Sequence, residues 1–109
     1  MTITEQYIAM VLPYLDENIE TELINGLTAY KFMCPWCTMY VQGEKFRKKK
    51  CASLVPIKDS FDYKFICSRS WSAECRSRHG GRSFYNFLAM YNPSLFNQYK
   101  RDLTREKKS

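Results

Sequence analysis

The spacing of the cysteines constrains this chain more than any other sequence feature. Two residues separate Cys34 from Cys37, and seven separate Cys67 from Cys75. A two-residue gap lets one tight turn present both sulfurs to the same ion, and tetrahedral zinc binds four such ligands at about 2.3 Å. The two pairs therefore predict a site for one Zn²⁺ per chain.

The fourth ligand of this site stays open on the sequence alone. Seven residues cannot form one knuckle turn, so either a loop bulges out between Cys67 and Cys75 or the fourth ligand lies elsewhere. His79 and Cys51 are the substitutes, because zinc accepts three thiolates and an imidazole as readily as four thiolates. We expect His79 to be the alternative fourth ligand and Cys51 to be an unpaired structural thiol. The expected ligand set is Cys34, Cys37, Cys67 and Cys75.

Length and composition indicate a small intracellular domain. A chain of 109 residues fits one domain, because domains cluster at roughly 100–150 residues. A hydrophobic fraction of 45% excludes a disordered tail, and no apolar run approaches the roughly 18 residues of a membrane helix. The amino terminus lacks the pattern of a secretory signal. We therefore expect a reducing compartment and no membrane partner, and there cysteines bind metal more often than they form disulfides.

Catalysis is not expected. The sequence Cys-Pro-Trp-Cys superficially resembles the active-site loop of thioredoxin-like proteins, but that chemistry needs the first cysteine at the start of a helix. Residues 38–43 are instead β-prone and then turn-forming. The chain also has no paired-carboxylate cluster that could hold two magnesium ions. These observations favour a binding protein over an enzyme.

The charge is divided unevenly along the chain. Residues 1–30 carry five acids and no Lys or Arg, whereas residues 31–109 carry all 17 basic residues against six acids. Such an excess suggests a polyanionic partner, although a solvated surface is the plain alternative. Trp71 lies in a polar loop and could stack on unpaired bases, whereas Trp36 is expected to pack around the metal. The expected nucleic-acid contacts are Lys45, Arg47, Lys48, Lys49, Lys50, Arg69, Trp71, Arg76, Arg78 and Arg82.

Periodicity predicts the secondary structure. Apolar residues spaced by about 3.6 predict a helix over residues 3–23, capped by Thr2, kinked at Pro13 and stopped by Asn25-Gly26. The polar stretch 68–82 is expected to be a loop. Short strands are expected at residues 27–33, 52–57 and 63–67. Two helices are expected from Ser83 and, after Asn92-Pro93, from Ser94, with residues 105–109 frayed.

This order of elements indicates an α+β fold. A small antiparallel sheet would carry the cysteine pairs at its turns, with a helix before it and a helical pair after it. Such a sheet has few residues for a core, so a structural metal would be most useful there. We expect a single zinc-ribbon domain over residues 1–109. Its parts are an acidic helical segment (1–26), a zinc-binding β-ribbon (27–82) and C-terminal helices (83–109).

The motifs together resemble a known family. YKFMCPWC at residues 30–37, the basic segment after it, YKFIC at 63–67 and SFYNFL at 83–88 resemble the amino-terminal zinc-binding domain of T-even-like phage DNA primases. That domain is related to the zinc ribbon of bacterial primases. Residues 12–15 and 92–99 are also similar, so the resemblance spans almost the whole chain.

The resemblance implies a zinc ribbon that reads single-stranded template and helps to position the first nucleotides of the primer. Cys34, Cys37, Cys67 and Cys75 occupy the family's ligand positions, and the basic segment corresponds to its template-facing surface. The chain departs from the family in the second pair, which is normally a two-residue knuckle. We also expect the chain to lack the catalytic primase domain.

We therefore expect a stand-alone primase-like zinc protein that binds nucleic acid, chiefly single-stranded DNA. It would act in or against DNA replication in the cytoplasm of a host bacterium. The alternative is an adaptor or inhibitor that contacts a replication or host transcription protein. The acidic amino-terminal segment and the wide loop after Cys67 motivate this alternative.

Overall fold

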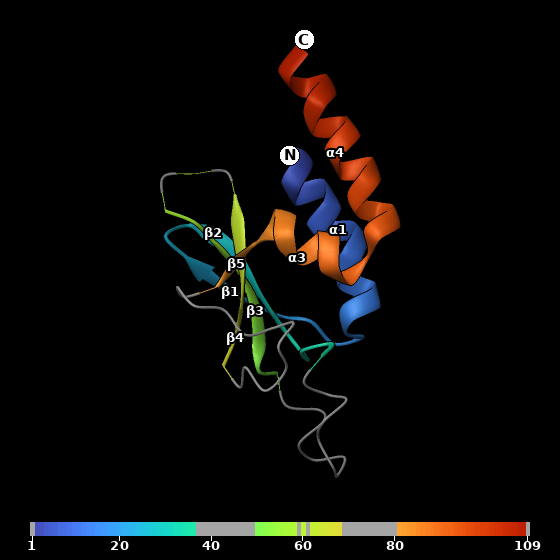
Figure 1. The fold of residues 1–109 in the computed structure, drawn as a ribbon. Coiled ribbons are helices and arrows are strands. Elements are labelled where there is room, and N and C mark those ends of the chain that lie inside the picture. Colours follow the sequence, from blue (N-terminus) through green and yellow to red (C-terminus); the bar gives the residue numbers. More distant parts are fainter. Residues whose placement is uncertain (1, 37–49, 59, 61, 69–80, 109) are drawn as a thin grey trace.

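The computed structural model describes residues 2–36, 50–58, 60, 62–68 and 81–108. These residues form a five-stranded antiparallel sheet, an N-terminal helix and two C-terminal helices, with the helices on one side of the sheet (Figure 1). The expected α+β class is confirmed at this level. Within the described part of the chain, no helix is long and apolar enough to cross a membrane.

Helix α1 (Ile3–Leu15) begins as its sequence predicts. The Thr2 hydroxyl accepts a hydrogen bond from the backbone N–H of Glu5 at 3.1 Å, and Pro13 lies inside the helix. The predicted extension to residue 23 is wrong. The backbone becomes extended at Asp16, whose carboxylate accepts a hydrogen bond from the N–H of Asn18 at 2.9 Å. This side-chain turn competes with a further helical turn, so the chain leaves α1 there.

Strand β1 (Glu20–Ile24) replaces the second half of the expected helix. It pairs antiparallel with β2 (Leu27–Phe32) across Asn25-Gly26. Asn25 and Gly26 have φ angles of 53° and 80°, and a two-residue hairpin with positive φ at both positions matches the twist of its strands. The Asn-Gly pair is therefore a hairpin turn rather than the end of a helix.

The remaining strands complete a sheet in which neighbours along the chain are neighbours in space. Strands β3 (Ala52–Pro56) and β4 (Tyr63–Cys67) confirm the expected positions, and β5 (Arg82–Ser83) was not expected. Gly81 precedes β5 with a φ of 131°, and a Cβ atom there would lie 2.8 Å from the carbonyl oxygen of Phe65. Only glycine lets the chain approach β4 this closely.

The core lies between the helices and the face of the sheet that they cover. Phe32, Leu54 and Phe65 from three strands are fully buried there. Phe87 of α3 (Phe84–Tyr91) stacks on Phe65 with ring centroids 4.6 Å apart. Val11 of α1 is also fully buried in the same cluster. Aromatic packing of this kind contributes beyond the burial of apolar area and fixes α3 on the sheet.

Helix α4 (Pro93–Lys108) is longer than expected. The Asn92 side chain accepts a hydrogen bond from the N–H of Leu95 at 3.1 Å, which confirms the predicted break before α4. The helix continues to Lys108, past the point where fraying was expected. Tyr99 of α4 is buried, and its hydroxyl lies 2.8 Å from the Thr4 hydroxyl of α1. This contact packs α4 against α1.

Candidate metal centre

The sheet topology places two predicted zinc ligands at the same end of the molecule. Strands β2 and β4 are both antiparallel to β3, so they run in the same direction and end at the same edge. In the register of the sheet, Phe32 lies opposite Ala52, and Ala52 lies opposite Cys67. Cys67 is the last residue of β4, and Cys34 follows the end of β2. The end of β2 and the end of β4 therefore lie at the same edge of the sheet.

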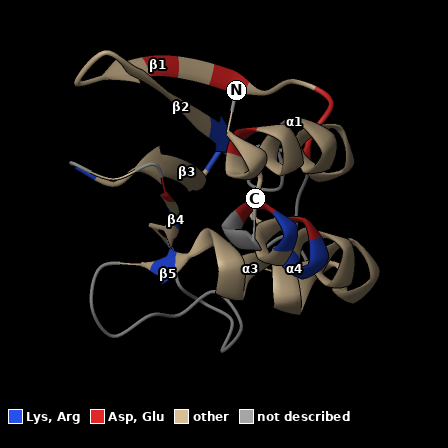
Figure 2. Ribbon diagram, turned by 90° about the horizontal axis from the view of Figure 1, so that it is seen from above, with Lys and Arg blue, Asp and Glu red and all other residues tan. Residues whose placement is uncertain are grey.

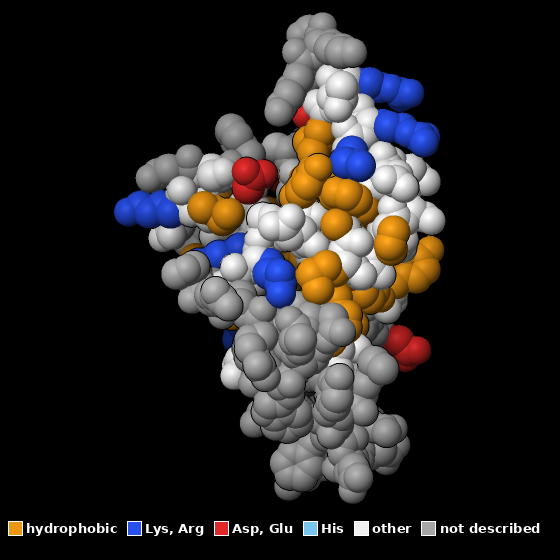
Figure 3. All heavy atoms as spheres, viewed as in Figure 1, with side chains coloured by type: hydrophobic (Ala, Val, Ile, Leu, Met, Phe, Trp, Pro, Cys, Tyr) orange, Lys and Arg blue, Asp and Glu red, His pale blue; other side chains and the backbone are white. Residues whose placement is uncertain are grey.

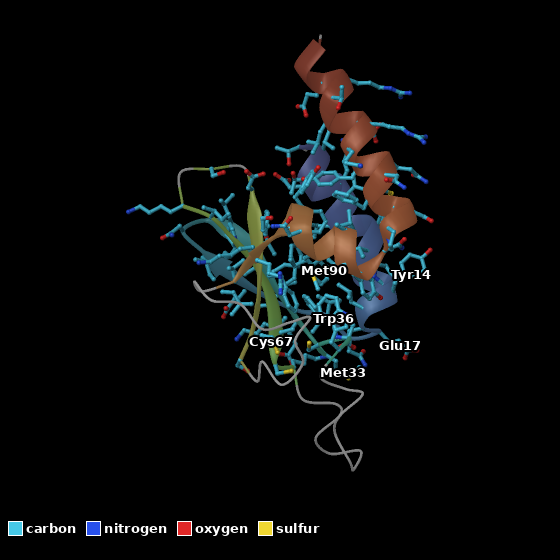
Figure 4. All side chains as sticks on the ribbon, in the orientation of Figure 1. Tyr14, Glu17, Met33, Trp36, Cys67 and Met90 are labelled. Carbon is cyan, nitrogen blue, oxygen red and sulfur yellow. The ribbon has the colours of Figure 1, made fainter. Side chains whose placement is uncertain are left out.

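Both of these cysteines are withdrawn from solvent. Cys34 is fully buried and Cys67 is 6% exposed. Figure 4 shows Cys67 toward the same end of the molecule as Met33, which precedes Cys34, and Trp36, which follows it two residues later. A buried pair of thiols at one sheet end fits the donor set that zinc prefers.

The other candidate ligands, Cys37, Cys75 and His79, lie outside the described residues. Among the residues that the structure describes, no three His, Cys, Asp or Glu side chains are grouped so that they could hold a metal ion.

Cys51 reaches the same end of the sheet from β3. It immediately precedes Ala52 and is 7% exposed, and it belongs to the hydrophobic core cluster. Its carbonyl oxygen accepts hydrogen bonds from both the N–H and the hydroxyl of Ser68, at 2.8 and 3.1 Å. These bonds tie the start of β3 to the residue after Cys67. Cys34 and Cys67 belong to the same buried cluster, so the structural role expected for Cys51 stays a prediction.

Trp36 packs against the aromatic core, while the expected packing around a metal stays a prediction. Its ring lies edge-on to Phe65 and Phe87, with centroid distances of 5.6 Å to each, and edge-on to Tyr91 at 6.3 Å. These contacts fasten the segment after β2 to α3. The ring is therefore partly buried against the core.

A buried ion pair, which the sequence analysis did not anticipate, lies beside the cysteine end. The Asp16 carboxylate accepts hydrogen bonds from the Lys50 ammonium at 2.8 Å and from the N–H of Met33 at 3.0 Å. The side chains of Asp16 and Lys50 are only 3% and 17% exposed. Burial raises the pKa of Asp16, but the hydrogen bonds from Lys50, Asn18 and Met33 outweigh it and hold this pKa below its usual value of 3.8.

This ion pair joins the two ends of a predicted functional segment. Met33 lies just before the first cysteine pair, and Lys50 is the last residue of the basic run. Asp16 therefore connects both Met33 and Lys50 to the C-terminal end of α1. The Asp16–Asn18 spacing is a recognisable turn signal, but no local pattern links Asp16 to a lysine so distant in sequence.

Two of the expected nucleic-acid contacts can be located. Lys50 forms the ion pair with Asp16. Arg82 is partly exposed on β5 and lies opposite Phe65 in the register of the sheet. The others lie outside the described residues: Lys45, Arg47, Lys48, Lys49, Arg69, Trp71, Arg76 and Arg78.

Two acidic residues of the amino-terminal segment form ion pairs within the protein. Asp16 is buried against Lys50, and Glu22 forms an ion pair with Lys31 at 3.5 Å. Figure 2 shows acidic residues spread over β1, α1 and the turn between them. The arrangement therefore adds no specific support for the adaptor alternative.

No protein-family model matches the chain, and no curated protein matches it.

Proposed function

We propose that this chain is a primase-like zinc-binding protein of the zinc-ribbon type that binds nucleic acid, with single-stranded DNA as its principal target. It would act in or against DNA replication in the cytoplasm of a host bacterium. The observation that supports this proposal best is the common sheet end reached by Cys34 and Cys67, because two distant cysteines arrive there on strands that run in the same direction.

The zinc part of the proposal follows from the chemistry of these thiols. Cys34 and Cys67 would hold the ion together with Cys37 and Cys75, with His79 as the alternative to Cys75. A bound Zn²⁺ would supply a structural crosslink, since a closed site of four protein ligands leaves no position for a substrate. Cys34 is fully buried and Cys67 is 6% exposed, so water has little access to these two residues.

The nucleic-acid part of the proposal follows from charge. Residues 31–109 carry 17 Lys or Arg residues against six acids, and phosphate contacts by such residues release condensed counterions. The crosslink would bring the basic segment after Cys37 and the arginines after Cys67 to one end of the sheet. A single strand suits this basic surface because its flexible sugar-phosphate backbone can follow the positions of the positive charges.

The test is a binding titration by fluorescence anisotropy with labelled single-stranded DNA, duplex DNA and single-stranded RNA at several salt concentrations. We expect tightest binding to single-stranded DNA, with affinity falling steeply as salt rises. The matched control is the same protein after chelation of zinc, which should bind more weakly because its basic segments are no longer held together. Absence of binding to any of the three targets at low salt would overturn the proposal.

A further inference from the structure

The outer face of α4 carries a row of polar and basic side chains. Tyr99 and Leu103 point inward, and the opposite side of the helix is exposed to solvent. Figure 3 shows Lys and Arg side chains projecting from this side of α4, in the part of the helix that extends past α1 in Figure 1. The residues that line a shallow groove here, called the α4 stripe below, are Asn97, Lys100, Arg101, Thr104 and Arg105.

The cationic groups of the α4 stripe are available to a partner. Arg105 is 81% exposed, and its contact with the Asp102 carboxylate is long, at 3.9 Å. The Lys100 ammonium lies over the Phe96 ring, 5.0 Å from its centroid, which orients the side chain without neutralising it. Within the described part of the chain, Arg101 has no ion-pair partner. The stripe therefore presents its positive charge to solvent.

We propose that the α4 stripe binds the phosphate backbone of a nucleic acid, as a contact separate from the cysteine end of the sheet. Arg101 and Arg105 are one helical turn apart, and four residues of helix rise about 6 Å. Successive phosphates of an extended single strand are separated by a similar distance, so the two arginines can contact neighbouring phosphates. Asn97 adds a neutral donor of the kind that commonly accompanies Arg and Lys at phosphates, whereas the Thr104 hydroxyl already donates to the Lys100 carbonyl oxygen at 2.9 Å.

The residues of the α4 stripe favour a nucleic acid, rather than an acidic protein surface, as its binding partner. Stable protein interfaces have an apolar or aromatic centre surrounded by a polar rim. The α4 stripe contains no apolar residue among those that line its groove. Contacts with phosphate need no such centre, because charge neutralisation and hydrogen bonding carry the affinity. A polyanion with regularly spaced charges is the occupant that matches these residues.

This inference rests on the proposed function for the identity of the partner, but it depends on different residues. The cysteine end and the α4 stripe lie toward opposite ends of the molecule (Figures 1 and 4). A strand bound at both places would run along the helical layer.

The experiment compares Arg101→Gln, Arg105→Gln and the double variant with Lys58→Gln in the anisotropy titration with labelled single-stranded DNA. Lys58 is exposed in the turn after β3, so its loss changes the net charge equally at a different place. We expect each arginine substitution to weaken binding roughly five- to tenfold at low salt and to reduce the slope of log K against log salt by about 0.7. The control should change affinity by less than about twofold, and melting temperatures should be unchanged because the arginines are exposed.

Each outcome is decisive. If the wild type binds and the arginine variants behave like Lys58→Gln, the α4 stripe is not a contact, while the proposed function stands. If the wild type binds no oligonucleotide, the proposed function fails. In that case the wild type and Arg101→Gln are both titrated with poly-L-glutamate. If the wild type binds this polymer and Arg101→Gln does not, the stripe has an acidic polypeptide rather than a nucleic acid as its partner, and the proposal is overturned.

Discussion

The Lys50 ammonium lies 2.8 Å from the Asp16 carboxylate, in an ion pair that joins the end of α1 to the chain just before β3. The same carboxylate accepts the N–H of Met33, so a single side chain connects three parts of the fold at the cysteine end.

Removal of Lys50 should therefore destabilise the fold. Lys50→Met leaves a buried carboxylate without its cation, and breaking a buried pair in this way costs about 3–5 kcal/mol. We expect a loss of about 3 kcal/mol, at the lower end, because two backbone N–H groups still bond to Asp16. Urea unfolding measures this loss, with Lys58→Met as the exposed control that should change stability by less than about 0.5 kcal/mol. Equal effects of the two substitutions would show that the ion pair contributes nothing.

Asp16 should also make stability depend on acid pH. Its folded-state pKa lies below the usual value of 3.8, so its stabilisation is present above that pH and is lost as the pH falls through the folded-state pKa. The melting temperature of the wild type should therefore decline more steeply below about pH 4 than that of Asp16→Asn. Parallel curves for the two proteins would contradict this assignment.

Tyr7 should make stability depend on alkaline pH. Burial and a hydrogen bond to the Asp102 carboxylate raise the pKa of Tyr7 to about 12. Its stabilisation is present below the ordinary tyrosine pKa of 10.0 and is lost as the pH rises toward 12. Tyr7→Phe should remove this part of the pH dependence, measured by thermal melting from neutral to alkaline pH. An unchanged alkaline slope in Tyr7→Phe would argue against the raised pKa.

Gly81→Ala should destabilise the junction between β5 and β4. The new Cβ atom would lie 2.8 Å from the Phe65 carbonyl oxygen, and the φ of 131° is unfavourable for alanine. We expect a cost of about 1–3 kcal/mol in chemical unfolding. Gly26→Ala is the matched control, because Gly26 has positive φ but nothing within 4 Å of its added Cβ. A smaller loss at Gly81 than at Gly26 would contradict the proposed close approach.

Local patterns predicted much of this fold. The cap at Thr2, the break at Asn92-Pro93 and the strand Tyr63–Cys67 each depend on neighbouring residues, and each is confirmed. The error over residues 16–23 arose where two local signals competed. The apolar period of α1 continues to Leu23, yet Leu23 is 76% exposed, and the Asn25-Gly26 turn makes this segment a strand.

The features that were missed depend on contacts distant in sequence. The Asp16–Lys50 pair needs the end of α1 to meet the start of β3, and β5 needs Gly81 to lie against β4. For the candidate site, sequence spacing identified Cys34 and Cys67, and the sheet topology then placed both at one end. The remaining predicted ligands, Cys37, Cys75 and His79, stay predictions because they lie outside the described residues.

The most direct test of the zinc assignment is the metal content of the purified chain, measured together with its folding. We expect one zinc per chain and cooperative unfolding on chelation, because binding free energy at such a site is also folding free energy. Cys34→Ser and Cys67→Ser should each lose the metal, whereas Cys51→Ser should retain it. A chain that contains no metal, takes up none when zinc is added, and melts at the same temperature with and without chelator would contradict the account.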